Sequence, residues 1–262
     1  MHKIKVPNEK IRTDLISEQK NITPKRRSYP KENIIIEEIN RRKNHTTTIY
    51  FEDITEQENY EIVQKYFIEE IKKYLNRIQK KKILIIGLGN PKSTPDSLGP
   101  KTIEKILVTS YLFKLGKKIE NGYQNVSTFI PDVTGNTGIE TSIILKSLIE
   151  CTKVEIVIVI DALKTNSIVR LGKTIQITNQ GISPGSGIGN KRKEISKRTM
   201  GLDVISIGIP TVIDMYNYVE EENLIVTPTN IDFLIEKLST LIGEGLNISI
   251  HRDYLRQKAQ KK

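Results

Sequence analysis

The sequence predicts an α/β protein in which a mostly parallel sheet is flanked by helices. Two observations support this prediction. Three segments, 81–89, 154–160 and 204–209, are almost continuously apolar, which is typical of strands buried on both faces of a sheet. Other segments before and between them have the apolar spacing of amphipathic helices. Strands and helices that alternate in this way favour helices packed against a parallel sheet.

The elements follow in chain order. Residues 1–50 are polar and basic, with prolines that interrupt any periodicity, so we expect an extended basic arm to about residue 50. A helix is predicted over 58–79, where apolar side chains form one stripe and charges cover the other side. Glycines stop the strand at 81–89. The remaining predicted elements are helices at 97–114 and 138–150, strands at 126–130, 154–160, 174–178 and 204–209, and a last helix from an N-cap at Asn230 to about Gly243.

Composition and charge exclude several classes of protein. The 262 residues are 37% hydrophobic and 27% charged, an ordinary globular composition. The net charge of +10 lies at the two ends: residues 1–45 hold 12 basic and 6 acidic residues, and residues 251–262 hold 5 and 1. This distribution makes nucleic-acid binding an unlikely primary function. No apolar run approaches the roughly 18–20 residues of a membrane helix, the N-terminus lacks a secretory signal, and Cys151 is alone. We therefore expect a soluble intracellular protein without a membrane partner.

Three short segments resemble known functional motifs, but each lacks a residue or an element that the motif requires. The dinucleotide-binding glycine pattern at 87–92 has Lys92 in place of its third glycine, and the phosphate-loop pattern before Thr174 has Ser167 in place of its first. The serine-hydrolase pattern around Ser183 is followed by a glycine-rich loop, whereas that mechanism needs a helix there. These patterns do not indicate a nucleotide cofactor or a serine nucleophile.

Two carboxylates follow predicted strands and are the candidate catalytic pair. Asp96 lies in the loop after 81–89, and Asp161 directly follows 154–160. Ligands gather at the carboxyl ends of parallel strands, so both side chains are expected at one edge of the sheet. A simpler interpretation of Asp96 is a helix cap, which its spacing alone favours. Two close carboxylates can share a proton, one activating water and the other acting as an acid.

Two glycine-rich loops accompany the carboxylates. Glycine lets a backbone approach a substrate closely, so these loops are candidate substrate-binding elements, although tight turns are the alternative. Basic residues directly after the second loop either contact acidic substrates or form an ordinary solvated run. The candidate residues are Gly135 and Gly138 in the loop at 131–141, and Gly185, Gly187, Gly189 and Arg192 in the loop at 181–192.

Taken in order, several long motifs resemble the germination protease family of endospore-forming bacteria. They are IRTDL (11–15), GLGNPKSTPDSLGP (87–100), TGNTGIET (134–141), DALKTNS (161–167), TIQITNQGISPGSGIGNKR (174–192), ISIGIPTVID (205–214), LIVTP (224–228) and GLNISIH (245–251). The resemblance implies an aspartic-type endopeptidase with no cofactor or metal, and a fold similar to that of hydrogenase-maturation endopeptidases. Its two essential aspartates correspond to Asp96 and Asp161.

The resemblance also implies a substrate and a life history. Its members start the degradation of small acid-soluble spore proteins during germination, which places them in the cytoplasm of the forespore and spore core. They are homotetramers by the same resemblance, and they are made as zymogens that remove an N-terminal segment by autoprocessing. Carried over, residues 1–14 are a propeptide, the scissile bond is Asp14–Leu15, and residues 15–262 form one peptidase domain.

The chain departs from the family pattern at four places, none of which involves Asp96 or Asp161. Asn179 stands where the family has an acid, Asn166 replaces an arginine, Asp132 replaces a glycine, and the stretch between Asp214 and Leu224 is shorter than in Bacillus-type members.

Two alternatives stay open. The likeness to hydrogenase-maturation enzymes suggests a metal-dependent peptidase that uses Asp96, Asp161 and, as a further candidate ligand, Glu140. The other alternative is an inactive homologue that holds spore proteins or nucleic acid through its basic ends.

Overall fold

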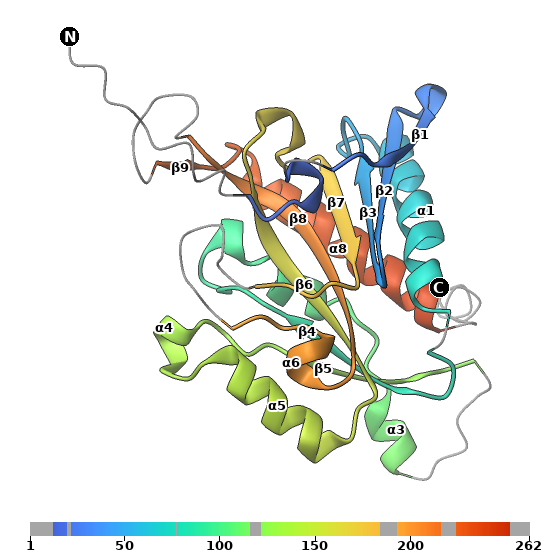
Figure 1. The fold of residues 1–262 in the computed structure, drawn as a ribbon, viewed down its shortest axis with the longest axis vertical. Coiled ribbons are helices and arrows are strands. Elements are labelled where there is room, and N and C mark those ends of the chain that lie inside the picture. Colours follow the sequence, from blue (N-terminus) through green and yellow to red (C-terminus); the bar gives the residue numbers. More distant parts are fainter. Residues whose placement is uncertain are drawn as a thin grey trace.

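A computed structural model describes residues 13–19, 22–76, 78–115, 122–183, 193–215 and 224–251. Within these ranges one mixed sheet of nine strands runs through the molecule, in the order β1-β2-β3-β7-β8-β6-β4-β5, with β9 paired to β8 (Figure 1). The strands are β1 (Lys25–Tyr29), β2 (Ile34–Arg41), β3 (Asn44–Tyr50), β4 (Lys82–Gly87), β5 (Asn125–Phe129), β6 (Ile156–Thr165), β7 (Thr174–Thr178), β8 (Asp203–Asp214) and β9 (Ile225–Val226).

The centre of the sheet is parallel, as predicted: β4 pairs with β5 and β6, and β6 pairs with β8. The other strands join antiparallel. The α-helices are α1 (Gln57–Tyr74), α2 (Leu98–Ile103), α3 (Ser110–Lys114), α4 (Thr134–Thr137), α5 (Thr141–Thr152), α6 (Lys197–Met200) and α8 (Ile231–Ile250). Short 3₁₀ turns are η1 (Ile16–Glu18), η2 (Pro30–Glu32), η3 (Thr94–Asp96) and η4 (Ile168–Arg170).

Two apolar clusters lie on opposite faces of the sheet. Ile156, Ile158 and Ile160 of β6 face the larger cluster, which includes buried side chains of α1, α2 and α8. Val157 and Val159 of the same strand face the smaller cluster, to which α5 and α6 contribute. This alternation is the period-2 geometry of a strand buried on both sides, and it explains why 154–160 is continuously apolar.

The structure corrects the expected N-terminal arm. Residues 25–50 form β1, β2 and β3, and β3 pairs with β7. Pro24 and Pro30 flank β1 and do not interrupt it. Ile34, Ile36 and Ile39 are buried in β2, so its polar residues alternate with a buried apolar set. These antiparallel strands need apolar side chains on one face only, so their other positions can be polar or basic. The basic composition of the segment therefore did not indicate strands.

Smaller differences concern element lengths. The helix predicted at 97–114 is broken into α2 and α3, and the last helix continues beyond Gly243 to Ile250. Strands β6 and β8 also extend past their predicted ends, because each supplies the other's backbone partners as far as Thr165 and Ile213. None of the described helices is long and apolar enough to cross a membrane.

Candidate active site

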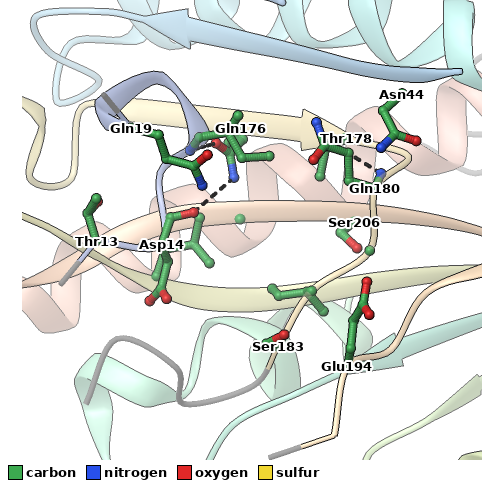
Figure 2. A pocket seen from close by; sticks show the side chains of 15 residues that line it. Thr13, Asp14, Gln19, Asn44, Gln176, Thr178, Gln180, Ser183, Glu194 and Ser206 are labelled. Atoms are coloured by element: carbon green, nitrogen blue, oxygen red, sulfur yellow. Dashed lines mark hydrogen bonds between the residues drawn. The ribbon is translucent and has the colours of Figure 1, made fainter. Parts of the chain in front are cut away.

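A polar cleft lies on the face of the sheet that carries the smaller apolar cluster. Its floor is built by β7 and β8, whose apolar side chains point to the opposite face, so that polar groups point into the cleft. The cavity measures about 290 Å³. Figure 2 shows its polar lining, which includes Asn44, Gln176, Thr178, Gln180, Ser183, Glu194 and Ser206.

Asp161 lies in β6, the strand that pairs with β8 of the cleft floor. Its side chain has the strand parity of Val157 and Val159, and the residue is 6% exposed. It is in register with Gly208 of β8, which lines the cavity. The sequence placed Asp161 directly after its strand, whereas it lies within β6. Burying a carboxylate is costly unless the site compensates for it, which keeps Asp161 a strong functional candidate.

Asp96 lies near the same end of the parallel strands. It is half-buried at the end of η3, and its Oδ2 accepts a hydrogen bond of 2.8 Å from the backbone N–H of Asn90. The loop closes tightly because Gly89 has φ +114°, and a Cβ there would lie 1.9 Å from the carbonyl oxygen of Asp96. Ser97, not Asp96, occupies the N-cap position of α2, so the helix-cap interpretation of Asp96 is wrong.

The loop of Asp96 and the strand of Asp161 are joined through their backbones. The N–H of Leu88 donates to the carbonyl of Ile160 at 2.8 Å, directly before Asp161, and η3 lies against β6. The structure therefore brings the loop of one candidate aspartate to the strand of the other. This agrees with the expectation that both lie at one edge of the parallel sheet.

The N-terminal segment 13–19 is docked in the cleft. The backbone N–H of Asp14 donates to the carbonyl of Lys164 at 3.0 Å, and the N–H of Lys164 donates to Oδ2 of Asp14 at 2.9 Å. The pairing of β6 with β8 shifts register between Leu163 and Lys164. At this bulge, where ladder bonds are disrupted, the backbone groups of Lys164 bind the segment instead.

Burial holds the same segment on the C-terminal side of Asp14. Leu15 is fully buried, and the N–H of Ile16 donates to Oε1 of Gln176 at 2.7 Å. The Glu18 carboxylate, 3% exposed, accepts hydrogen bonds from the Thr165 hydroxyl (2.5 Å) and the Asn166 N–H (3.0 Å).

Glu18 also pairs with a cation over an aromatic ring. The Arg170 guanidinium lies 3.2 Å from its carboxylate and 5.3 Å from the centre of the Tyr50 ring. Burial raises the pKa of Tyr50, so its hydroxyl stays protonated and donates to Glu37 at 2.8 Å. An apolar anchor and a buried ionic anchor thus secure residues 15–18, which the sequence analysis did not foresee.

The glycine loops are only partly described. Gly185, Gly187, Gly189 and Arg192 lie outside the described residues. Gly135 lies within α4 and Gly138 is its C-cap, and a Cβ at either position would meet nothing within 4 Å. Neither lines the cavity. Their proposed contacts with substrate stay a prediction.

Glu140 links the first glycine loop to the end of the second. Its Oε1 accepts a hydrogen bond of 3.3 Å from the N–H of Lys193. Among the described residues, no group of three His, Cys, Asp or Glu side chains lies close enough together to hold a metal ion. The ligand set Asp96, Asp161 and Glu140, on which the metal-dependent alternative depended, is therefore not assembled.

Two departures from the family pattern have structural explanations. Asp132 adopts φ 61°, a conformation that favours glycine, and its Oδ1 accepts hydrogen bonds from the N–H of Val133 (2.7 Å) and the amide of Asn136 (2.9 Å). Asn179 joins β7 to the β2–β3 hairpin, because its Oδ1 accepts from the N–H of His45 at 2.7 Å. Asn179 thus acts in the sheet.

The fold and the cleft define this chain as an α/β protein whose sheet binds its own N-terminal segment through two strands, one of which carries a buried aspartate. Comparison with known proteins identifies the family. The profile described as germination protease matches residues 31–221. The germination proteases of Geobacillus sp. strain WCH70 and Bacillus mycoides strain KBAB4 are each 46% identical over 187 residues, which is 70% of this chain. The chain belongs to the germination protease family.

The relatives are longer than this chain. The matched region covers 48% of the Geobacillus protein and 49% of the Bacillus mycoides protein, so the chain spans about half the length of the curated relatives it matches. Among solved structures, a [NiFe] hydrogenase maturation protease HycI from Thermococcus kodakarensis KOD1 aligns with 66% of this chain and 98% of its own. The TM-score is 0.37 and the identity 18%, a likeness too distant to support an inference about function.

Proposed function

We propose that this chain is an endopeptidase that starts the degradation of small acid-soluble spore proteins during germination. Membership of the germination protease family supports the class of activity. The observation that carries the proposal is the docked segment: residues 13–19 line one part of the polar cleft, and the Asp14–Leu15 bond lies beside the strand of Asp161. Such a segment occupies the place that a protein substrate would take.

The proposed chemistry is hydrolysis by water between two carboxylates. One aspartate, ionised, takes a proton from water as the water oxygen adds to the scissile carbonyl carbon. The other, protonated, gives a proton as the C–N bond breaks, so the products are a new carboxylate and a new amine. We assign these roles to Asp96 and Asp161 as a pair, without dividing them between the two.

The same geometry supports an autoprocessed zymogen. While residues 13–19 are docked, a protein substrate cannot reach the groups of Lys164 and Gln176 that the segment binds, and cleavage after Asp14 would remove the part bound to Lys164. We propose that protonation of the carboxylate pair loosens the segment, so we expect mild acid to promote self-cleavage. Removal of residues 1–14 would then free the backbone groups of Lys164 for a substrate, while Leu15 and Glu18 stay anchored. We further propose that the protein is a tetramer in the cytoplasm of the spore core.

The test is carboxylate removal. Asp96→Asn and Asp161→Asn should each abolish fragment formation from a small acid-soluble spore protein and self-cleavage in mild acid, followed by gel and mass spectrometry. The thermal unfolding midpoint should stay close to that of the unaltered chain. The matched control is Asp203→Asn, which removes an exposed carboxylate paired with Lys197. Near-normal turnover by either site variant would refute the two-aspartate mechanism.

The inactive-homologue alternative is judged in the same assay. If the unaltered chain binds the spore protein but releases no fragments in neutral or mildly acidic buffer, the chain is a binding protein.

The metal-dependent alternative is tested by chelation. If cleavage of the spore protein survives exhaustive chelation, a metal-dependent mechanism is excluded.

A further inference from the structure

Gln176 is a buried polar residue at the centre of β7. It lies between Ile175 and Ile177, which face the larger apolar cluster, so its own side chain points to the cleft. The residue is 5% exposed. A buried carboxamide without hydrogen-bond partners would be costly, so its partners indicate why this position is polar.

Both ends of that carboxamide contact the docked segment. Oε1 accepts the N–H of Ile16 at 2.7 Å, and Nε2 donates to the carbonyl oxygen of Asp14 at 3.5 Å. Figure 2 shows Gln176 reaching toward Asp14 across the cleft. The carbonyl of Asp14 belongs to the proposed scissile bond. One side chain therefore spans Leu15 and contacts the oxygen on which negative charge would develop during hydrolysis.

The sheet places Gln176 opposite Asp161. Gly208 is in register with Asp161 on one side and with Gln176 on the other, so the three residues form one row across the sheet. At the usual strand spacing the outer two Cα atoms are about 10 Å apart. Gly208 carries no side chain, and a Cβ there would lie 2.4 Å from Leu163. The Leu163 side chain therefore covers Gly208. Asp161 and Gln176 lie on either side of this glycine, and the Gln176 amide contacts the Asp14 carbonyl.

We propose that Gln176 is a catalytic residue that stabilises the oxyanion of the scissile carbonyl, an inference that rests on the proposed function. When water adds to the carbonyl carbon, its π electrons move to oxygen, and the Nε2–H of Gln176 stabilises that charge. When the C–N bond breaks, the carbonyl re-forms. The donor distance of 3.5 Å is long for the ground state. A contact that shortens only as charge develops favours the transition state over the substrate.

The experiment follows self-cleavage at Asp14–Leu15, a reaction within one molecule whose rate constant does not depend on substrate concentration. Gln176→Met removes both hydrogen bonds and should slow cleavage roughly 100- to 1,000-fold, as expected for loss of one oxyanion donor. Gln176→Glu keeps an acceptor for Ile16 and loses the donor when ionised. Relative to the unaltered chain, its rate should therefore recover toward low pH, where the protonated carboxyl can donate again.

The matched control is Gln57→Glu. Gln57 is exposed at the start of α1, outside the cleft, and its amide donates to the Glu61 carboxylate at 2.8 Å. This variant should cleave within about threefold of the unaltered chain and show no recovery at low pH. A purely structural role for Gln176 would slow cleavage without that pH-dependent recovery.

A second readout separates the two proposals. In the Asp161→Asn background, hydrogen exchange at the Ile16 amide should accelerate with Gln176→Met and not with Gln57→Glu, whether or not the protein is a peptidase. If the unaltered chain cleaves itself and both Gln176 variants match it within threefold, the oxyanion role is refuted while the proposed function stands. If the unaltered chain cleaves nothing, the proposed function fails and the catalytic role fails with it; hydrogen exchange then still reports whether Gln176 clamps the segment.

Discussion

Replacing Leu15 by alanine should release the N-terminal segment from the cleft. Leu15 is fully buried, and truncating a buried leucine costs about 2–5 kcal/mol. By comparison, a typical hydrogen bond contributes about 0.5–1.5 kcal/mol net. Four hydrogen bonds, one of them long at 3.5 Å, tie Asp14 and Ile16 to Lys164 and Gln176. Burial of the Leu15 side chain is thus comparable in free energy to these hydrogen bonds together.

The free-energy cost of Leu15→Ala should appear as more frequent undocking of the N-terminal segment. At about 1.4 kcal/mol per factor of ten, Leu15→Ala should increase the population of the undocked segment roughly 30- to 4,000-fold. Hydrogen exchange of the Asp14 and Ile16 amides, read by mass spectrometry, measures that population directly. Two control variants are compared with Leu15→Ala. Val169→Ala truncates an aliphatic side chain that is 78% exposed, and Asp14→Asn keeps an acceptor for the Lys164 N–H.

Both controls should leave exchange within a few-fold of the unaltered chain. If Leu15→Ala changes exchange by less than threefold, the apolar anchor does not hold the segment. The docking would then depend on the ionic anchor at Glu18, and Glu18→Ala would produce the larger effect.

The parallel centre of the sheet was the most predictable part of the fold. Strands β4, β6 and β8 are buried on both faces, so nearly every position must be apolar, and such runs are visible without knowledge of their partners. The same pattern placed Asp161 directly after its strand, whereas the structure has it within β6.

The antiparallel strands could not be predicted in the same way. Three consecutive threonines, Thr46 to Thr48, are fully buried in β3, and the Thr46 hydroxyl bonds that of Thr178 across 132 residues. Polar residues that are buried only because a distant strand supplies their partners look like loop residues in a sequence. Their structure depends on tertiary pairing, which overrides local preference.

Gln176 illustrates a signal that was present and not used. A glutamine between two isoleucines in a strand predicted from TIQIT indicates a polar group on a buried face. The sequence could therefore have marked it as a site candidate. Its partner, the segment around Leu15, lies some 160 residues earlier, and no local pattern connects the two.

Two further predictions concern the loop of Asp96 and a buried histidine. Gly89 has φ +114°, and Gly89→Ala would place a Cβ 1.9 Å from the carbonyl oxygen of Asp96. This variant should lower the thermal unfolding midpoint and abolish self-cleavage. The control is Gly135→Ala, which has open space around the new Cβ and should leave the midpoint unchanged. His251 is 1% exposed, and burial lowers its pKa below the ordinary 6.5. Its Nδ1 accepts the N–H of Gln124 at 3.2 Å, which requires a nitrogen without a proton. In the unfolded chain the His251 imidazole takes up a proton near pH 6.5, whereas in the folded chain it stays neutral. The contribution of neutral His251 to the free energy of unfolding is therefore complete above that pH. It is lost as the pH falls, by at most about 1.4 kcal/mol per pH unit. Urea unfolding at two pH values on either side of 6.5 should show a smaller loss in His251→Gln than in the unaltered chain, and an equal loss in both would refute this assignment.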